Sequence, residues 1–405
     1  SDIMDKLFFN CNLFDGTNTT LFKDAWFVVN SKGRISNYGT SEPPHNIVKK
    51  IDLNGKYVMP GLINAHTHIM MNPITNKTEY LTETEITVQA LHNLELLLKS
   101  GQTYIRDCGC AFNVDIQLAR LSQNNGLFNF KIPEIMPSGR PLSMTGGHGD
   151  FTEGIDGCST WGYLTDSPNE VRKAVRNAFK LGAKNIKVMA TGGVMSATDQ
   201  IDDTELSLEE LKMAVTEAHS KHMTVAAHAE GGVGIHNAVM AGVDSIEHGS
   251  YISDEDITIM KKQGTFLVPT LIAAWTIAEY GEGKLPQYML DKTKAFIEEY
   301  FKNIEKAIKN GVKFAFGTDA GTPFNKFEEA PYELQLLVQN GATNFQALQA
   351  AGKLSSELLG IDADYGTLEL GKFADFLVLD DNPLIDVKAV QQNNKQVYKK
   401  GHRMF

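Results

Sequence analysis

The sequence predicts an α/β protein: a (β/α)8 TIM barrel with a small β-sandwich domain built from both termini. A phrase of helix, glycine and strand recurs through the central part of the chain, where eight apolar strand candidates can be counted. Both ends of the chain instead carry short strand-like pieces without a helical period. Strands that alternate with helices form parallel β/α units, because a parallel pair needs a long crossover, and eight such units close a barrel.

The recurring phrase places a glycine between the end of a helical run and the start of a short apolar strand. Glycine suits the left-handed position that ends a helix, so each phrase predicts a helix end. Ser167, followed by Pro168 and Glu170, and Ser207, followed by Glu210, predict capping boxes at the starts of two helices. The glycines of the phrase are Gly101, Gly182, Gly242, Gly264 and Gly311.

Eight barrel strands are expected in the order in which the phrases occur. A long helical stretch between residues 273 and 310 exceeds one crossover, and we expect part of it to cover the barrel mouth. The expected strands are 58–65, 103–107, 132–137, 185–189, 224–229, 245–248, 265–269 and 313–318.

The two flanks are each too small to hold a core alone. A barrel of about 250 to 300 residues leaves roughly a hundred of the 405 residues unassigned. We therefore expect the flanks to pair with each other into one β domain. The predicted limits are 1–57 for its N-terminal part, 58–365 for the barrel and 366–405 for its C-terminal part.

Composition excludes several classes of protein. The chain is 42% hydrophobic and 21% charged, which argues against a disordered or collagen-like chain. A net charge of −11 would repel a phosphate backbone, so we expect no nucleic-acid partner. No window approaches the ~18 apolar residues of a membrane helix, so we expect no membrane partner.

The cysteines are too few and too unevenly spaced for a disulfide framework. This favours a reducing compartment and a cytoplasmic location. Because the C-G-C pair lacks a second pair, buried and unreactive thiols are favoured over metal ligands. The four cysteines are Cys11, Cys108, Cys110 and Cys158.

Five side chains of metal-ligand type fall at the C-terminal ends of the expected strands. His66 and His68 are two residues apart on one strand, so both project to one face. His228, His248 and Asp319 end three other strands. That rim is the active face of such a barrel, and five ligand-type side chains there predict a divalent metal site.

Lys187 lies inside the apolar strand NIKVMA, where an unpaired ammonium is costly to bury. One interpretation is that it faces the helix layer and extends its ammonium to solvent. The other is that it faces the metal site as a carbamate, formed from the neutral amine and carbon dioxide. A carbamate is an anion that can bridge two metal ions with one oxygen each.

Six of these residues and several sequence segments resemble those of a known family. His66, His68, Lys187, His228, His248 and Asp319 are similar to the metal set of the amidohydrolase superfamily. The segments PGLINAHTH and GTLELGKFADFLVLD are also typical of it, and the likeness covers nearly the whole chain. The segments SGRPLSMTGGHGD, KVMATGGVMS, IEHGSYI and GTDAGTP resemble the Xaa-Pro dipeptidase (prolidase-like) and imidazolonepropionase-like branch.

This resemblance implies a binuclear centre of two divalent ions, usually zinc. It implies that His66, His68 and Asp319 hold the more buried ion, that His228 and His248 hold the exposed ion, and that N6-carboxylated Lys187 bridges them. The expected reaction is hydrolysis of a dipeptide or an N-acyl amino acid, with Xaa-Pro the best single candidate. A metal-bridging hydroxide would attack, and Asp319 would shuttle the proton to the leaving nitrogen. A small-molecule substrate and a homo-oligomer are also implied.

Three further residues are expected at the substrate. His148, in the loop TGGHGD, is assigned to substrate binding or oxyanion support, although it could instead order its own glycine-rich loop. Arg140 could clamp a substrate carboxylate or pair structurally with an acid. Glu230 stands where many prolidase-like relatives have a second histidine, so it could change the substrate preference or orient a ligand imidazole.

Two other functions remain open. A mononuclear deaminase or cyclic-amide hydrolase would use Glu230 as its proton shuttle, but it has no use for a bridging carbamate at Lys187. A non-catalytic binding scaffold is the third possibility, and it has no physical need for six metal-directed residues.

Overall fold

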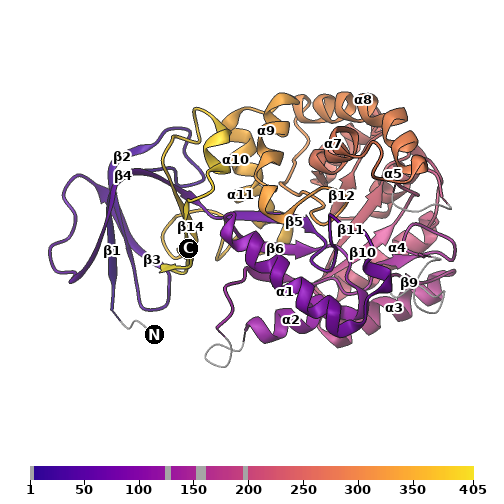
Figure 1. Cartoon of the computed structure of the whole chain (residues 1–405), viewed down its shortest axis with the longest axis horizontal. Helices are drawn as coiled ribbons and strands as arrows, with labels where there is room; N and C mark the ends of the chain where they lie inside the picture. Colours follow the sequence, from indigo (N-terminus) through magenta and orange to yellow (C-terminus); the bar gives the residue numbers. More distant parts are fainter. Residues whose placement is uncertain (1–3, 124–128, 152–160, 195–198) are drawn as a thin grey trace.

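The structure is a computed structural model that describes residues 4–123, 129–151, 161–194 and 199–405. Figure 1 shows two parts side by side: a sheet that contains strands from both ends of the chain, and a ring of strands surrounded by helices. The predicted fold class, a (β/α)8 barrel with a small β domain built from both termini, is confirmed.

The terminal strands hydrogen-bond into one seven-stranded sheet, in the order β16-β15-β14-β4-β1-β2-β3. The parallel pairing of β1 with β4 and the antiparallel pairing of β4 with β14 join the two ends of the chain. In the core of this sheet Phe8 stacks on Phe27, and Phe376 stacks on Tyr398. The strands are β1 Lys6–Leu13, β2 Phe22–Val29, β3 Ile35–Thr40, β4 Lys49–Pro60, β14 Phe376–Leu379, β15 Gln396–Lys399 and β16 His402–Arg403.

The first expected barrel strand, 58–65, is divided between the two parts of the structure. Its first residues end β4 in the terminal sheet, where Val58 pairs with Val378. Gly61 then separates β4 from β5, and its N–H donates to the Asp375 carbonyl at 2.9 Å. A Cβ at Gly61 would lie 2.3 Å from Thr103 Oγ1, so this close approach of two strands requires glycine.

The barrel strands are parallel and lie in two hydrogen-bonded groups, β5-β6-β7 and β10-β11-β12-β13. The Lys184 N–H bonds to the Pro137 carbonyl at 2.9 Å and links the two groups. Short strands β8 and β9 extend the second group beside β10. The bounds are β5 Leu62–Thr67, β6 Gln102–Asp107, β7 Glu134–Met136, β8 Leu142–Ser143, β9 Tyr163–Leu164, β10 Asn185–Met189, β11 Thr224–Ala229, β12 Ser245–His248 and β13 Phe266–Val268.

The eighth barrel position is occupied by residues 313–318, which make isolated bridges rather than a continuous strand. Phe314 bridges to Leu267 on one side. On the other side the Ala65 N–H donates to the Phe316 carbonyl at 2.8 Å. The ring therefore closes as predicted, although the eighth strand is irregular where it approaches Asp319.

Helices cover the outside of the barrel (Figure 1). Helices α7 and α8 occupy the long predicted helical stretch, and both contribute side chains to the barrel mouth. The helices are α1 Glu83–Lys99, α2 Val114–Ser122, α3 Pro168–Leu181, α4 Leu208–Ser220, α5 Gly232–Ala241, α6 Asp254–Gln263, α7 Leu271–Tyr280, α8 Gln287–Lys309, α9 Tyr332–Gln339, α10 Asn344–Ala350 and α11 Lys353–Leu359.

The predicted helix ends are confirmed at the level of backbone geometry. Ser207 forms the predicted capping box with Glu210. At Ser167 only half of the box is present: its hydroxyl accepts the Glu170 N–H, but the Glu170 carboxylate accepts from the Asp166 N–H instead of the Ser167 N–H. The glycines of the recurring phrase all have positive φ, and three of them are the C-caps of their helices: Gly182, Gly242 and Gly264.

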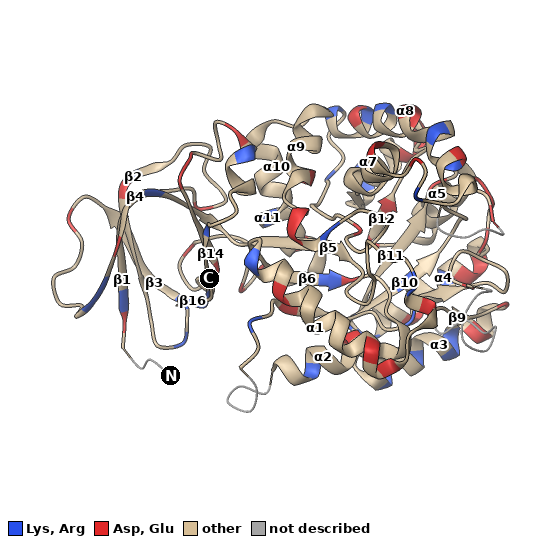
Figure 2. Cartoon of the chain, viewed as in Figure 1, with Lys and Arg blue, Asp and Glu red and all other residues tan. Residues whose placement is uncertain are grey.

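Acidic and basic residues are interspersed along the outer helices and loops (Figure 2). No helix in the described part of the chain combines the length and apolar character needed to cross a bilayer. Cys11, Cys108 and Cys110 are buried free thiols, as expected, whereas Cys158 lies outside the described residues.

Replacement of Gly264 by Ala is expected to destabilise the fold by about 1 kcal/mol. Gly264 ends α6 with φ 78°, and no atom lies within 4 Å of the position that an added methyl group would take, so the cost is backbone strain alone. Gly232→Ala is the matched control, because Gly232 begins α5 without a positive φ and its nearest contact would be 3.7 Å. Thermal unfolding should separate the two variants, and equal melting temperatures would contradict the assignment.

Candidate metal centre

The C-terminal end of β5 brings His66 and His68 to the same carboxylate. Both Nε2 atoms approach Asp319 Oδ1, at 3.0 Å for His66 and 2.9 Å for His68. Potential ligand atoms of the three residues all lie within 4.8 Å of one another. Two imidazoles and a carboxylate at this spacing could hold a divalent metal ion.

Hydrogen bonds on the far side of each ring set the tautomers. His66 Nδ1 lies 2.8 Å from Glu247 Oε1, and His68 Nδ1 lies 3.1 Å from the Gly109 carbonyl oxygen. Both oxygens are acceptors, so Nδ1 donates in each ring. This leaves the two Nε2 atoms to face the cavity, which is how outer partners usually prepare histidine ligands.

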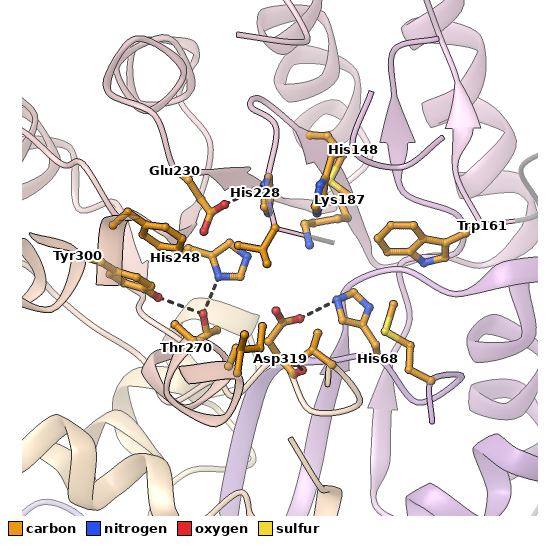
Figure 3. A pocket seen from close by; sticks show the side chains of 18 of the residues that line it. His68, His148, Trp161, Lys187, His228, Glu230, His248, Thr270, Tyr300 and Asp319 are labelled. Carbon is orange, nitrogen blue, oxygen red and sulfur yellow. Dashed lines mark hydrogen bonds and ion pairs between the residues drawn. The ribbon is translucent and has the colours of Figure 1, made fainter. Parts of the chain in front are cut away.

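His228 and His248 face the same cavity from β11 and β12 (Figure 3). His228 Nε2 donates to the Gly192 carbonyl at 2.9 Å, which leaves Nδ1 as its available ligand atom. His248 Nδ1 lies 2.6 Å from Thr270 Oγ1, which leaves Nε2. The centres of the His228 and His248 rings are 4.8 Å apart, and His248 is 5.3 Å from His66.

Lys187 faces this cavity rather than the helix layer (Figure 3). Its side chain is almost fully buried, and Nζ donates to the Cys108 carbonyl at 3.3 Å. The structure therefore does not support the interpretation in which the ammonium extends to solvent. The amine shares the cavity with the candidate metal ligands His68, His228, His248 and Asp319.

The protonation preferences of the histidines fit metal ligation. Burial lowers the pKa of His228 well below its usual value and lowers that of His248 to about 3. Both rings are therefore neutral and keep a lone pair, the form that binds metals. Burial raises the pKa of Asp319, but His66 and His68 lower it more, so this carboxylate is ionised.

The upward shift of the His66 pKa favours a proton at the position that a metal ion would occupy. Burial lowers its pKa, but Cys108 and Asp319 raise it more, and the net shift is upward. A proton on Nε2 then faces the Asp319 carboxylate across 3.0 Å. A divalent cation can take the place of that proton, so the donor set fits a metal ion.

Three residues of the candidate metal centre have strained backbone conformations. His248, Thr270 and Asp319 have φ values of 74°, 49° and 56°, in the left-handed region that non-glycine residues rarely adopt. Strained residues of this kind tend to cluster at functional sites, where the surrounding structure holds them. Here they aim two candidate ligands and the Thr270 hydroxyl that fixes His248.

His148 lines the cavity together with the metal-directed residues other than His66. Its ring stacks on His228 with centres 4.2 Å apart and planes 13° apart. Its Nδ1 lies 3.3 Å from Asp199 Oδ2, and its backbone N–H donates to Glu205 at 2.8 Å. Burial lowers the pKa of His148, but the contact with Asp199 raises it more.

The other two expected substrate residues differ in position. Glu230 lines the cavity. Arg140 is absent from the described lining residues, and its guanidinium donates to the carbonyl oxygens of Trp161 and Gly162. These contacts are with backbone carbonyl groups, so the predicted clamp on a substrate carboxylate and the alternative pairing with an acid both stay predictions.

Sequence reasoning missed the ion pair beneath the site. Arg106 on β6 and Glu247 on β12 are fully buried and 3.0 Å apart, and Glu247 also holds His66. The available signal was the same as for Lys187: each charged residue lies inside an apolar strand, in YIRD and SIEH. Opposite charges on two buried strands predict a partner for each other.

It also missed the walls of the cavity, which come from loops and from the helices over the mouth. Trp161 lies beside His68, with ring centres 5.6 Å apart. Phe296 and Tyr300 of α8 line the opposite side, and Tyr300 reaches the Thr270 hydroxyl at 3.4 Å. No local pattern could assign these residues, because their contacts depend on where α8 crosses the barrel.

The fold and this site define a barrel with a candidate metal centre at its C-terminal face. A model of the amidohydrolase family matches residues 57–404. The chain therefore belongs to the amidohydrolase family.

Individual relatives support this assignment. Ochratoxinase from Aspergillus niger is 36% identical over 295 residues, which cover 67% of this chain and 60% of that protein. The chain thus matches less than two thirds of the length of this curated relative. A solved structure of a Xaa-Pro dipeptidase with bound methionine in the active site is 30% identical, with a TM-score of 0.89 over 98% of this chain and 99% of the other. A prolidase solved with N-methylphosphonate-L-proline is 29% identical, with a TM-score of 0.89 over the same shares.

Replacement of Glu247 by Gln is expected to lower the free energy of unfolding of the metal-free protein by about 3 kcal/mol near pH 7, because it leaves Arg106 buried without its counter-charge. Burial raises the pKa of Glu247, but Arg106 and His66 lower it more, to about 2, below its ordinary 4.5. The stabilisation is therefore present above pH 4.5 and lost as the pH falls toward 2.

Urea unfolding across this pH range should show the deficit of Glu247→Gln shrinking below about pH 4.5. Exposed Glu328→Gln is the control and should show little deficit at any pH. A deficit for Glu247→Gln that stays constant down to pH 3 would contradict the depressed pKa.

Proposed function

We propose that this chain is a binuclear metal-dependent hydrolase that cleaves the amide bond of a dipeptide or an N-acyl amino acid, with Xaa-Pro dipeptides as the best candidates. The observation that carries the proposal is the approach of His66 and His68 to Asp319, beside the cavity that His68 and Asp319 line together with Lys187, His228 and His248. The likeness to a Xaa-Pro dipeptidase with methionine in its active site supports an amino-acid-sized substrate.

The six residues would hold two divalent ions, with zinc as the expected metal. His66, His68 and Asp319 would bind the more buried ion, and His228 and His248 the other. Lys187, carboxylated on its amine, would bridge them and would no longer bring a positive charge to the site. Bound metal ions would lower the pKa of water and polarise the scissile carbonyl group.

The chain's own residues then supply proton transfer and orientation. Asp319 is an ionised carboxylate at the base of the cavity, so it can accept the proton of the attacking water and deliver it to the departing nitrogen. His148 can donate to the carbonyl oxygen, because Asp199 faces its other ring nitrogen. The aromatic walls at Trp161 and Tyr300 would reduce the access of bulk water.

Other parts of the proposal rest on the sequence and the family likeness. The small number of cysteines favours a cytoplasmic location, and the likeness favours a homo-oligomer. The domain limits 1–57, 58–365 and 366–405 stay predictions, as does a role for Arg140 at the substrate.

The direct test is metal content per chain together with a panel of Xaa-Pro, Xaa-Arg and N-acyl substrates. The proposal expects two metal ions and release of an amino acid. One ion with release of ammonia from a heterocycle would instead support the deaminase alternative. No metal and no turnover would favour the non-catalytic scaffold.

Lys187→Ala is expected to lose metal and activity together, with turnover reduced by about three orders of magnitude or more. The bridging anion is absent in this variant, so the two ions repel each other without compensation. Metal content by mass spectrometry and circular dichroism for fold integrity are the measurements. Unchanged metal stoichiometry would refute the carbamate.

Asp319→Asn is expected to reduce turnover by about 10²- to 10⁴-fold while keeping the fold, because an amide of the same shape cannot carry the proton. The kinetic constants should be compared with those of Asp362→Asn, which changes an exposed acid remote from the cavity. Turnover of Asp319→Asn within tenfold of the wild type would exclude Asp319 as the proton shuttle.

A further inference from the structure

Glu230 presents an unsatisfied carboxyl oxygen in the candidate active site. The residue directly follows β11, is 5% exposed and lines the cavity with Asp319 and His148. Its Oε1 accepts a bond from Ser250 Oγ at 3.3 Å. Its Oε2 has no hydrogen-bond partner among the residues that the structure describes.

His228 does not account for this carboxyl group. The nearest ring nitrogen, His228 Nε2, lies 3.7 Å from Glu230 Oε2, beyond hydrogen-bonding distance (Figure 3). That nitrogen already donates to the Gly192 carbonyl at 2.9 Å. Orientation of the His228 ring is therefore assigned to Gly192, and Oε2 of Glu230 remains available to a ligand.

The basic side chains of the region have other contacts. His148, which lines the cavity with Glu230, faces Asp199 Oδ2 with Nδ1 at 3.3 Å. Lys292 donates to the Gly193 carbonyl at 2.7 Å and is absent from the described lining of this cavity. Arg140 contacts backbone carbonyls, and Lys187 is assigned to the metal centre. A buried carboxyl oxygen is costly to leave without a hydrogen-bond donor, and an ammonium group on the ligand would supply one to Oε2.

The two proposed substrate classes, dipeptides and N-acyl amino acids, differ in whether they carry a cationic group near the scissile carbonyl. In a dipeptide of apolar residues the cationic group is the α-ammonium of the acyl residue, one carbon from the scissile carbonyl. An N-acyl amino acid has no ammonium in that position. A carboxylate in the cavity therefore distinguishes the two classes, since it forms a charge-assisted hydrogen bond with only one of them.

We propose that Glu230 binds the free α-ammonium group of the acyl residue and so makes dipeptides, rather than N-acyl amino acids, the preferred substrates. This inference rests on the proposed amide hydrolysis and sharpens it. It makes Glu230 a specificity-determining residue that touches the substrate, while proton transfer stays with Asp319.

A pair of product-like ligands tests the inference by binding alone. L-leucine and 4-methylpentanoate share the carboxylate and the side chain and differ only in the ammonium group. Titration calorimetry on the metal-loaded wild-type protein should show L-leucine binding at least about tenfold tighter. In Glu230→Gln this ratio should fall below about twofold, chiefly through weaker binding of L-leucine.

Two further variants separate charge from packing. Ser250→Ala removes the hydroxyl at Oε1 and keeps the carboxylate, so the preference for L-leucine should remain. Glu230→Asp keeps the charge on a shorter side chain and should retain part of the preference. Metal content is measured for every variant.

Several outcomes would overturn the inference. They are no binding of either ligand to the wild type, no preference in the wild type, or a preference that persists in Glu230→Gln. Loss of metal in Glu230→Gln would also overturn it, because Glu230 would then support the metal centre rather than the ligand. Equally weakened binding of both ligands to Glu230→Gln, at full metal content, would overturn the inference as well.

The result is distinguishable from a failure of the proposed function. A Glu230-dependent preference without hydrolysis of any dipeptide would leave the ammonium site in place and refute the activity. Hydrolysis of dipeptides and N-acyl amino acids alike, with no preference in binding, would keep the activity and refute the ammonium site.

Discussion

The Glu247 carboxylate, enclosed between the Arg106 guanidinium and the His66 ring, connects the interior of the barrel to the candidate metal centre. Its bonds to His66 and Arg106 measure 2.8 and 3.0 Å, and both carboxylate partners are fully buried. Because His66 Nδ1 is held there, Nε2 must face Asp319. The geometry of the first candidate metal site therefore depends on the Arg106–Glu247 pair, which contacts the candidate ligand His66 through Glu247 and is absent from the described lining of the cavity.

The other two candidate histidine ligands, His228 and His248, are also oriented by hydrogen bonds, but their partners are neutral. Backbone and hydroxyl oxygens, from Gly192 and Thr270, hold His228 and His248 so that one nitrogen of each stays available. Lys187 lies between the two halves on β10. A single cavity thus contains imidazoles with one nitrogen available, an ionised carboxylate and a buried amine, and this donor set fits divalent cations.

Much of the fold was predictable because its rules are local. The glycines of the recurring phrase follow helices and have positive φ, and the strands at 185–189, 224–229 and 245–248 have the predicted bounds. The first and eighth strands were less predictable. Residues 58–65 are apolar except for Asn64, and no local feature tells which sheet their first half joins. Residues 313–318 bend toward Asp319, so hydrogen bonding with both neighbours is interrupted.

The sequence by itself determined which residue types follow the barrel strands. Because the parallel strands of a barrel all end at one face, it also predicted that these side chains lie close together. Only the tertiary structure decided which way Lys187 points, that Arg140 contacts backbone carbonyls, and that Glu230 keeps an unpaired oxygen inside the cavity. Those outcomes depend on partners distant in the chain, such as Cys108, Trp161 and Ser250. A side chain's environment is set by packing between elements, and no local sequence pattern contains it.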